Sequence, residues 1–332
     1  MYATILSVIR KGSKNSRYLI LTENNEYGSM VAANEKYNLG DYSKIEEKID
    51  SNVKNSWLNT YYNWANTKQK ILIHLAKYKK EKLGIEANGI WINQDGEEIE
   101  YQHILPERYI FENLIHSSFY DSMINSYHKK VESIHPGFKN LNSSQAFAFN
   151  FFQPIIDNNL YYVLLENNEL KNYRFYSEYE KVNEDETQFD FYIQNDSFSA
   201  SFEVKYTEDT FGYTDYDSHK EKWDSTYKEK VEKLLGKDVL SPDDFFVNYQ
   251  IWRNILFTME KNHHTYFLYP KFRKDDLSPV IERIMETYPE LKERVTILYA
   301  DVFVNKIMTN ENFSEALKEH YQEFKRKYLD IL

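Results

Sequence analysis

The 332-residue sequence contains no cysteine, which excludes a disulfide framework and any metal site built on thiolates. Glycine and proline are scarce, at 9 and 7 residues, so few positions should interrupt helices or strands. No run approaches the roughly 20 apolar residues of a membrane span, and the apolar run at the N-terminus is too short and broken for a signal peptide. We therefore expect an ordered, soluble protein of the cytoplasm with no membrane partner.

A net positive charge is also lacking. The formal net charge is −11, whereas proteins that coat nucleic acid are usually basic. The charge is uneven, because residues 1–140 hold 18 Lys and Arg against 17 Asp and Glu, and the remainder holds 23 against 35. An acidic enzyme can still bind DNA through local patches, so this balance does not exclude a nucleic-acid substrate.

Hydrophobic periodicity divides the chain into two regions. Residues 1–88 predict short strands and a helix near 51–83 that closes at Gly84, and we interpret them as an N-terminal α+β recognition or accessory element. Residues 89–332 begin with a hairpin turned at Asp95-Gly96 and a helical stretch over 107–133.

The rest of this second region alternates between helices and strands. We expect a helix over 143–153 that is capped by Ser143 or Ser144 and stopped by Pro154. The following segments are then predicted: extended over 161–166 and 172–180, strands over 187–193 and 198–206, a helix over 245–260, a strand over 264–270, a helix near 278–288, a strand over 295–303 and a helix over 314–329. This order predicts an α/β fold with a central mixed sheet flanked by helices.

Two consecutive predicted strands carry charged residues among apolar ones. Strand alternation places Asp190 on the polar face of residues 187–193, and it places Glu203 and Lys205 on the polar face of residues 198–206. If these strands form a hairpin, the three charges gather on one face of the sheet.

The hairpin register decides how close the charges come. With a turn over 194–197, Ile193 pairs with Phe198, and Asp190 lies opposite Ser201 and diagonal to Glu203. Diagonal neighbours are about 7–8 Å apart at the backbone, within reach of one metal ion.

Hard carboxylate oxygens suit Mg²⁺ or Mn²⁺, and few protein ligands leave room for water and phosphate. Such an ion would offset the repulsion between Asp190 and Glu203 and lower the pKa of a bound water. Lys205 would orient or deprotonate that water, or stabilise charge on the phosphate.

These residues carry a resemblance. Asp190, a spacer of 12 residues and Glu203-Val204-Lys205 resemble the PD-(D/E)XK nuclease superfamily, which includes restriction endonucleases. Flanking segments over roughly residues 90–270 resemble one bacterial restriction-endonuclease-like group: Gln102 to Pro106, Ser143-Ser144-Gln145 with Asn150, Phe189-Asp190, Phe202 to Tyr206, and Tyr249-Gln250 with Arg253-Asn254. The resemblance implies a restriction-endonuclease-like core with a central mixed sheet and a Mg²⁺-dependent endonuclease activity.

By position in the motif, Asp190 and Glu203 would bind the metal ion and Lys205 would be the catalytic lysine. Gln250 would assist from the following helix.

The sequence departs from the pattern at two places. Phe189 stands where the superfamily has its proline, and Gln145 stands where many members have a glutamate. A third carboxylate could come from Glu178 or Glu180, and spacing does not choose between them.

Nucleic-acid contacts are predicted for Gln145, Lys79, Lys80 and Arg253, although a lysine-rich helix end is more often a solvated surface. The function that these patterns favour is a DNA endonuclease of restriction or phage defence, with RNA a less favoured substrate. The alternative is an inactive nuclease-fold module that binds nucleic acid or a protein partner. Cleavage of both strands usually needs two active sites, which a homodimer would supply.

Overall fold

The computed structural model describes residues 3–10, 15–22, 27–33, 56–93, 95–117, 134–183, 187–212, 214, 216–237, 239–259 and 262–331. The chain divides into two compact units, Met1–His74 with Leu332, and Leu75–Ile331. The division at residue 88 into a recognition or accessory element and a nuclease-like domain stays a prediction. None of the helices in the described part of the chain has the length and apolar character needed to cross a membrane.

The first unit contains an antiparallel three-stranded sheet. Its strands are β1 (Ala3–Arg10), β2 (Asn15–Thr22) and β3 (Tyr27–Ala33), in that spatial order. Helix α2 (Ser56–Glu81) begins in this unit and ends in the second. It closes as predicted, because Gly84 takes a left-handed φ of +67° and Ile85 N donates to Lys79 O at 3.1 Å.

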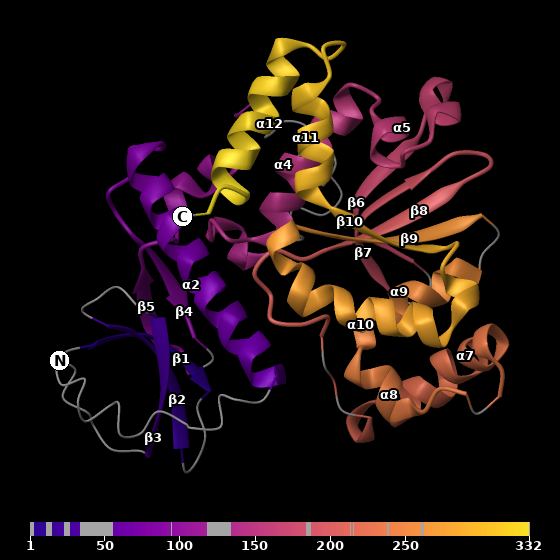
Figure 1. The fold of residues 1–332 in the computed structure, drawn as a ribbon, viewed down its shortest axis with the longest axis horizontal. Coiled ribbons are helices and arrows are strands. Elements are labelled where there is room, and N and C mark those ends of the chain that lie inside the picture. The colour runs from indigo at the N-terminus through magenta and orange to yellow at the C-terminus, as the bar shows by residue number, and fades with distance from the viewer. Residues whose placement is uncertain are drawn as a thin grey trace. The chain divides into compact units, whose positions relative to one another are not determined.

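The second unit is built on a five-stranded mixed sheet, shown in Figure 1, which confirms the predicted fold class. Its strands lie in the order β10-β9-β8-β7-β6, with β6 to β8 antiparallel and β8 to β10 parallel. Their bounds are β6 (Tyr176–Val182), β7 (Gln188–Gln194), β8 (Ser199–Val204), β9 (His263–Tyr269) and β10 (Val295–Tyr299). The predicted hairpin is also present, as β4 (Gly89–Ile92) and β5 (Glu98–Tyr101).

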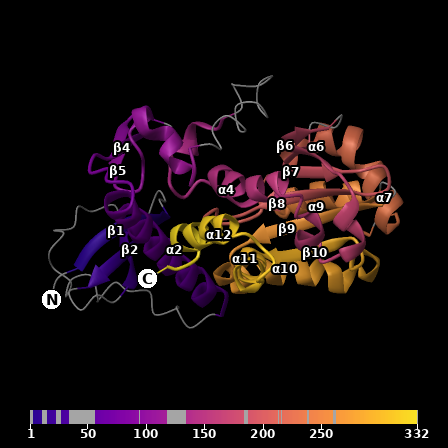
Figure 2. The ribbon, with the colours of Figure 1, turned by 90° about the horizontal axis from the view of Figure 1, so that it is seen from above.

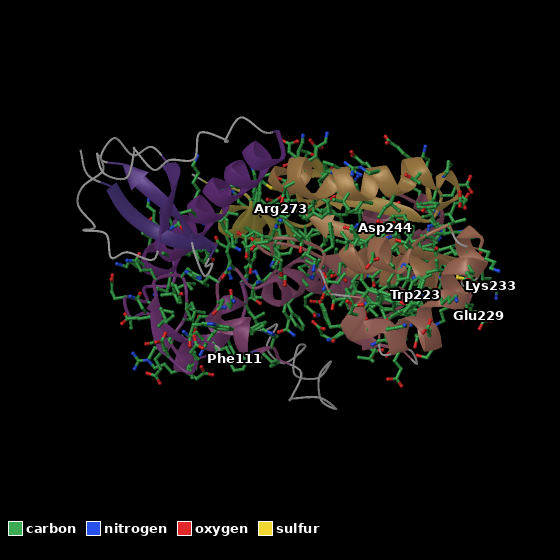
Figure 3. All side chains as sticks on the ribbon, turned by 90° about the horizontal axis from the view of Figure 1, so that it is seen from below. Phe111, Trp223, Glu229, Lys233, Asp244 and Arg273 are labelled. Atoms are coloured by element: carbon green, nitrogen blue, oxygen red, sulfur yellow. The ribbon has the colours of Figure 1, made fainter. Side chains whose placement is uncertain are left out.

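Helices cover both faces of this sheet (Figure 1). One face carries α4 (Ser144–Asp157), α11 (Ala300–Thr309) and α12 (Glu315–Tyr328), and Figure 2 shows α12 beside α4 from above. Phe152 of α4 stacks on Phe191 of β7 with ring centroids 4.0 Å apart. The other face carries α7 (Lys228–Leu235), α8 (Pro242–Val247), α9 (Tyr249–Ile255) and α10 (Lys274–Thr287). Aromatic rings fill that layer, for example Trp223, labelled in Figure 3, which packs on Phe245 at 5.2 Å.

Helix α4 begins as predicted but does not stop at Pro154. Ser143 Oγ caps it by accepting a hydrogen bond from Ala146 N at 3.3 Å. Proline lacks the N–H that would bond to the carbonyl four residues earlier, which is Asn150 O. His320 Nε2 of α12 donates to that carbonyl at 2.7 Å, so the polar group released by Pro154 is satisfied and the helix continues to Asp157.

Three further predictions were wrong in part. Residues 161–166 were expected to be extended, but Tyr161–Leu164 forms α5, because the buried Leu160, Tyr161 and Leu164 follow helical spacing. The last strand ends at Tyr299, and α11 follows with buried residues at helical spacing. The helix expected over 245–260 is divided into α8 and α9 at Asn248, whose φ of −123° is not helical.

The remaining differences concern the segments between these elements. Within the helix expected over 107–133, Glu107–Asn113 is a 3₁₀ segment, and residues 118–133 lie outside the described part. Helical turns were not predicted after the site strand, where the structure has Asp217–His219, α6 (Lys220–Lys222), the π-helical Trp223–Tyr227 and α7.

Candidate active site

The register of β7 and β8 brings the two candidate metal ligands closer than predicted. Ile193 pairs with Ala200 rather than with Phe198, a shift of two residues. The turn has the expected four residues but lies one residue further along, over 195–198 instead of 194–197, where Asn195 Oδ1 accepts hydrogen bonds from Ser197 N and Phe198 N, both at 2.9 Å. A shift of two preserves the faces, so Asp190 now falls beside Glu203 instead of diagonal to it.

The paired positions of β7 and β8 end at Phe191 and Phe202. Beyond them, the side chain of Asp190 accepts the hydrogen bond instead of a main-chain carbonyl. Val204 N donates to Asp190 Oδ2 at 2.6 Å. The predicted alternation along β7 is also broken here, because Phe189 stacks on Tyr192 at 6.0 Å instead of sharing a face with Phe191. Glu180, on the neighbouring strand, has a left-handed φ of 49°, so the backbone of β6 is irregular at this point as well.

Glu203 and Lys205 are almost completely buried, at 3% and 5% exposure. They lie at the end of a central strand that is covered on both faces, whereas a half-buried polar face was expected. Lys205 Nζ is 2.9 Å from Glu203 Oε1, and it lies 5.9 Å from the centre of the Phe211 ring. Protein atoms therefore shield this ion pair from water.

The charged groups shift one another's protonation. Burial raises the pKa of Asp190 well above its ordinary value, and the nearby carboxylates of Glu203 and Glu180 raise it further. Burial lowers the pKa of Lys205, but Glu203, Glu208 and Asp190 together raise it more, so its pKa lies above the ordinary lysine value. Lys205 is thus held as a cation.

Glu208 is a fourth charged group of this cluster, in the loop after β8. Its carboxylate accepts a hydrogen bond from Tyr206 N at 2.8 Å. Burial raises its pKa, but the charge of Lys205 and hydrogen bonds, including one from Ser144, lower the pKa more. The fully buried Arg273, labelled in Figure 3, donates to Tyr206 O and to Glu208 O, both at 2.7 Å. This loop is therefore held rigidly next to Lys205.

The two candidates for a third carboxylate lie in different surroundings. Glu178 forms an ion pair with Lys181 at 2.9 Å. Glu180 lies beside Asp190 in the β6–β7 register, between two paired positions, and it accepts hydrogen bonds from Gln188 and from Gln145 Nε2, the latter at 3.4 Å. Of the two, Glu180 is the one that the fold brings to Asp190.

Three residues of helix α9 lie at different distances from the charged cluster. Asn254 Nδ2 donates to Glu203 Oε2 at 2.8 Å. Gln250 lies against Gly212, where a β-carbon would come within 3.0 Å of Gln250 Cδ, and its Oε1 is buried without a partner in the described part of the chain. Arg253 reaches the start of β7, where its Nη2 donates to Gln188 O at 3.4 Å.

The other predicted nucleic-acid contacts are dispersed. Gln145 Oε1 accepts a hydrogen bond from His135 N at 3.1 Å, in addition to the contact with Glu180. Lys80 is exposed and lies 3.7 Å from Glu86. Lys79 is fully buried and donates to Ala87 O, Asn88 Oδ1 and Ile104 O, which is a structural role rather than the phosphate contact expected for it.

The donor set fits a divalent cation with oxygen preference. Asp190 is a half-buried carboxylate beside the buried Glu203, and a cation would offset the repulsion that raises the Asp190 pKa. Within the described ranges, no group of three or more His, Asp or Glu comes together as ligands of one ion. Mg²⁺ commonly takes only one or two carboxylates and keeps waters and phosphate oxygens in its other positions, so two are compatible with it.

The family model described as "Restriction Endonuclease associating with ARP" matches residues 72–329. The chain belongs to this family. The predicted restriction-endonuclease resemblance is thereby confirmed, and the matched segment contains every candidate site residue from Lys79 to Asn254. Membership supports a nuclease-like function. No curated protein and no solved structure matches the chain.

Two residues of the site were not assigned from the sequence. Asn254 belongs to the helix segment that carried the resemblance, and its spacing of four from Gln250 places both on one helical face. That spacing could have identified it. Glu208 lies in a loop, where residue spacing does not report position, so no sequence pattern pointed to it.

Proposed function

We propose that this chain is a Mg²⁺-dependent endonuclease that hydrolyses phosphodiester bonds of DNA in restriction or phage defence, with Mn²⁺ as a second suitable cation. The observation that supports it is the gathering of Asp190, Glu203 and Lys205 at the end of β8, with Lys205 Nζ 2.9 Å from Glu203 Oε1. RNA is a less favoured substrate.

Each residue has a role that follows from its surroundings. Asp190 and Glu203 would hold the ion, which when bound polarises a phosphoryl oxygen and lowers the pKa of a water. Val204 N fixes the Asp190 carboxylate. Lys205, kept protonated by its carboxylate neighbours, orients the attacking water and stabilises negative charge on the phosphate. Gln250 would assist from α9.

The substrate and partners extend the same proposal. Gln145, Lys80 and Arg253 are candidate DNA contacts outside the charged cluster. Cleavage of both strands usually needs two active sites, and a homodimer would provide them. The family is named for an association with ARP, and we propose that this chain shares that partner.

Plasmid cleavage in Mg²⁺, in Mn²⁺ and in EDTA tests the activity. We expect cleavage with either cation and none in EDTA. Lys205→Ala should lower the cleavage rate about 100- to 1000-fold, since it removes a preorganised charge at the phosphate.

Lys318→Ala is the matched control. Lys318 also forms an ion pair, with Glu315 at 3.0 Å, but on the surface of α12, so its loss should leave the rate unchanged. If the wild-type protein cleaves no plasmid, linear DNA or RNA with either cation, the nuclease proposal is wrong. Binding without cleavage would then favour an inactive nuclease-fold module that binds nucleic acid or a protein partner.

A further inference from the structure

Asn254 is a buried amide on α9 that contacts a carboxylate of the proposed metal site, and it is only 1% exposed. Its Nδ2 donates to Glu203 Oε2 at 2.8 Å, while Lys205 Nζ lies 2.9 Å from Glu203 Oε1. Each oxygen of Glu203 therefore has its own donor, and the carboxylate is held from two sides. The lone pairs that remain on these oxygens then point in fixed directions.

Asn254 is itself held through its main chain. Thr265 Oγ1 on β9 donates to Asn254 O at 3.0 Å, and Ser201 Oγ on β8 lies 3.2 Å from Thr265 Oγ1. His263 Nε2 lies 3.1 Å from Ser201 Oγ, so the polar chain continues along the sheet. These bonds attach Asn254 to β8, the strand that carries Glu203.

One polar atom of this arrangement lacks a partner. Asn254 Oδ1 is buried and accepts no hydrogen bond from any residue that the structure describes. Exchanging the two amide atoms would place oxygen against a Glu203 oxygen, so the contact with Glu203 decides the assignment. A buried amide oxygen without a donor is costly, and a water held by a cation beside Glu203 would supply the donor.

We propose that Asn254 is a positioning residue of the metal site, in which Nδ2 orients Glu203 and Oδ1 accepts a hydrogen bond from a water on the cation. This rests on the proposed function, because it requires a metal ion at Asp190 and Glu203. Residues that orient metal ligands in this way typically contribute about 10- to 100-fold to metal affinity.

Titration calorimetry of the intact protein with Mg²⁺ and with Mn²⁺, without nucleic acid, tests the role. Asn254→Leu keeps a similar side-chain shape and removes both polar atoms, so it should weaken cation binding about 10- to 100-fold. Thr258→Val is the matched control. Thr258 is buried one turn further along, and its hydroxyl donates locally to Ile255 O at 2.7 Å, so its loss should leave the affinity unchanged.

The outcomes separate this inference from the proposed function. A wild-type protein that binds neither cation overturns both. A wild-type protein that binds, with Asn254→Leu binding equally well, overturns only the role of Asn254. If Asn254→Leu does not fold, the smaller Asn254→Ala takes its place. Thr265→Val, which releases Asn254 O, should also weaken cation binding, by a smaller factor than Asn254→Leu or Asn254→Ala.

Discussion

At the scale of single residues, burial separates neighbours that look equivalent in the sequence. Lys79 and Lys80 both belong to a basic helix end, and both were predicted to contact nucleic acid. Lys79 is fully buried and its pKa is lowered, chiefly by burial, while Lys80 is exposed. Helical phase differs by about 100° between consecutive residues, so one lysine enters the interior and the other remains at the surface.

Lys79→Met tests this difference. The change leaves three acceptors, on Ala87, Asn88 and the buried Ile104, without their donor, and we expect the free energy of unfolding to fall by about 1–3 kcal/mol. Lys80→Ala removes an exposed contact with Glu86 and should change it by less than about 1 kcal/mol. Urea denaturation measures both. Equal losses for the two variants would contradict the structural role of Lys79.

At the scale of elements, the sequence predicted what depends on short-range periodicity. Burial along β7 alternates as expected, although Phe189 departs from its expected face, and the two site strands form the expected hairpin. The register was wrong because the four-residue turn lies one residue further along than expected, where the side chain of Asn195 holds it. The end of α4 was wrong because the donor that compensates Pro154 lies on α12, a contact between distant segments. The closeness of Asp190 to Glu203 depended on that register, so the sequence could give the faces but not the distance.

Two buried histidines on different elements should make the protein sensitive to acid. Burial lowers the pKa of His320 on α12 and the pKa of His263 on β9 to about 4. His116 lowers the His320 pKa further, whereas Asn150 O and Glu323 raise it. His264 lowers the His263 pKa further. Between pH 6.5 and 4 the unfolded chain therefore binds more protons than the folded protein. The contribution of these two histidines to the free energy of unfolding is fully present above pH 6.5 and is lost as the pH falls towards 4.

His320→Gln should reduce this acid sensitivity, because glutamine keeps an N–H donor for Asn150 O but does not titrate. The difference in unfolding free energy between pH 7 and pH 4 should shrink by on the order of 2–3 kcal/mol relative to the wild type. Urea denaturation at both pH values gives this comparison. An unchanged difference would mean that His320 is not held neutral.

At the scale of the whole molecule, the family match over residues 72–329 nearly coincides with the compact unit Leu75–Ile331. That unit contains all of the candidate site, which draws on β7, β8 and α9. The resemblance noticed in the sequence covered roughly residues 90–270, and the family match extends it to the last helix. The first unit lies almost entirely outside the match, so the prediction that it is a recognition or accessory element rests on the sequence alone.

The last helix is part of the core rather than an appendage. Beside the bond from His320 to Asn150 O, Tyr321 Oη donates to Phe151 O at 2.8 Å, and the buried Lys327 donates to Asn113 O at 2.6 Å. A chain that ends at residue 314 should therefore lose its cooperative thermal transition, which calorimetry would detect. A truncated protein that melts like the full chain would contradict this.

The same bonds bear on how the protein is made. During synthesis α4 leaves the ribosome well before α12, with the carbonyls of Asn150 and Phe151 still lacking their donors. The interior around α4 can close only when α12 has been translated. A chain whose translation stops before α12 would leave this interior open and would be cleared as unfolded protein.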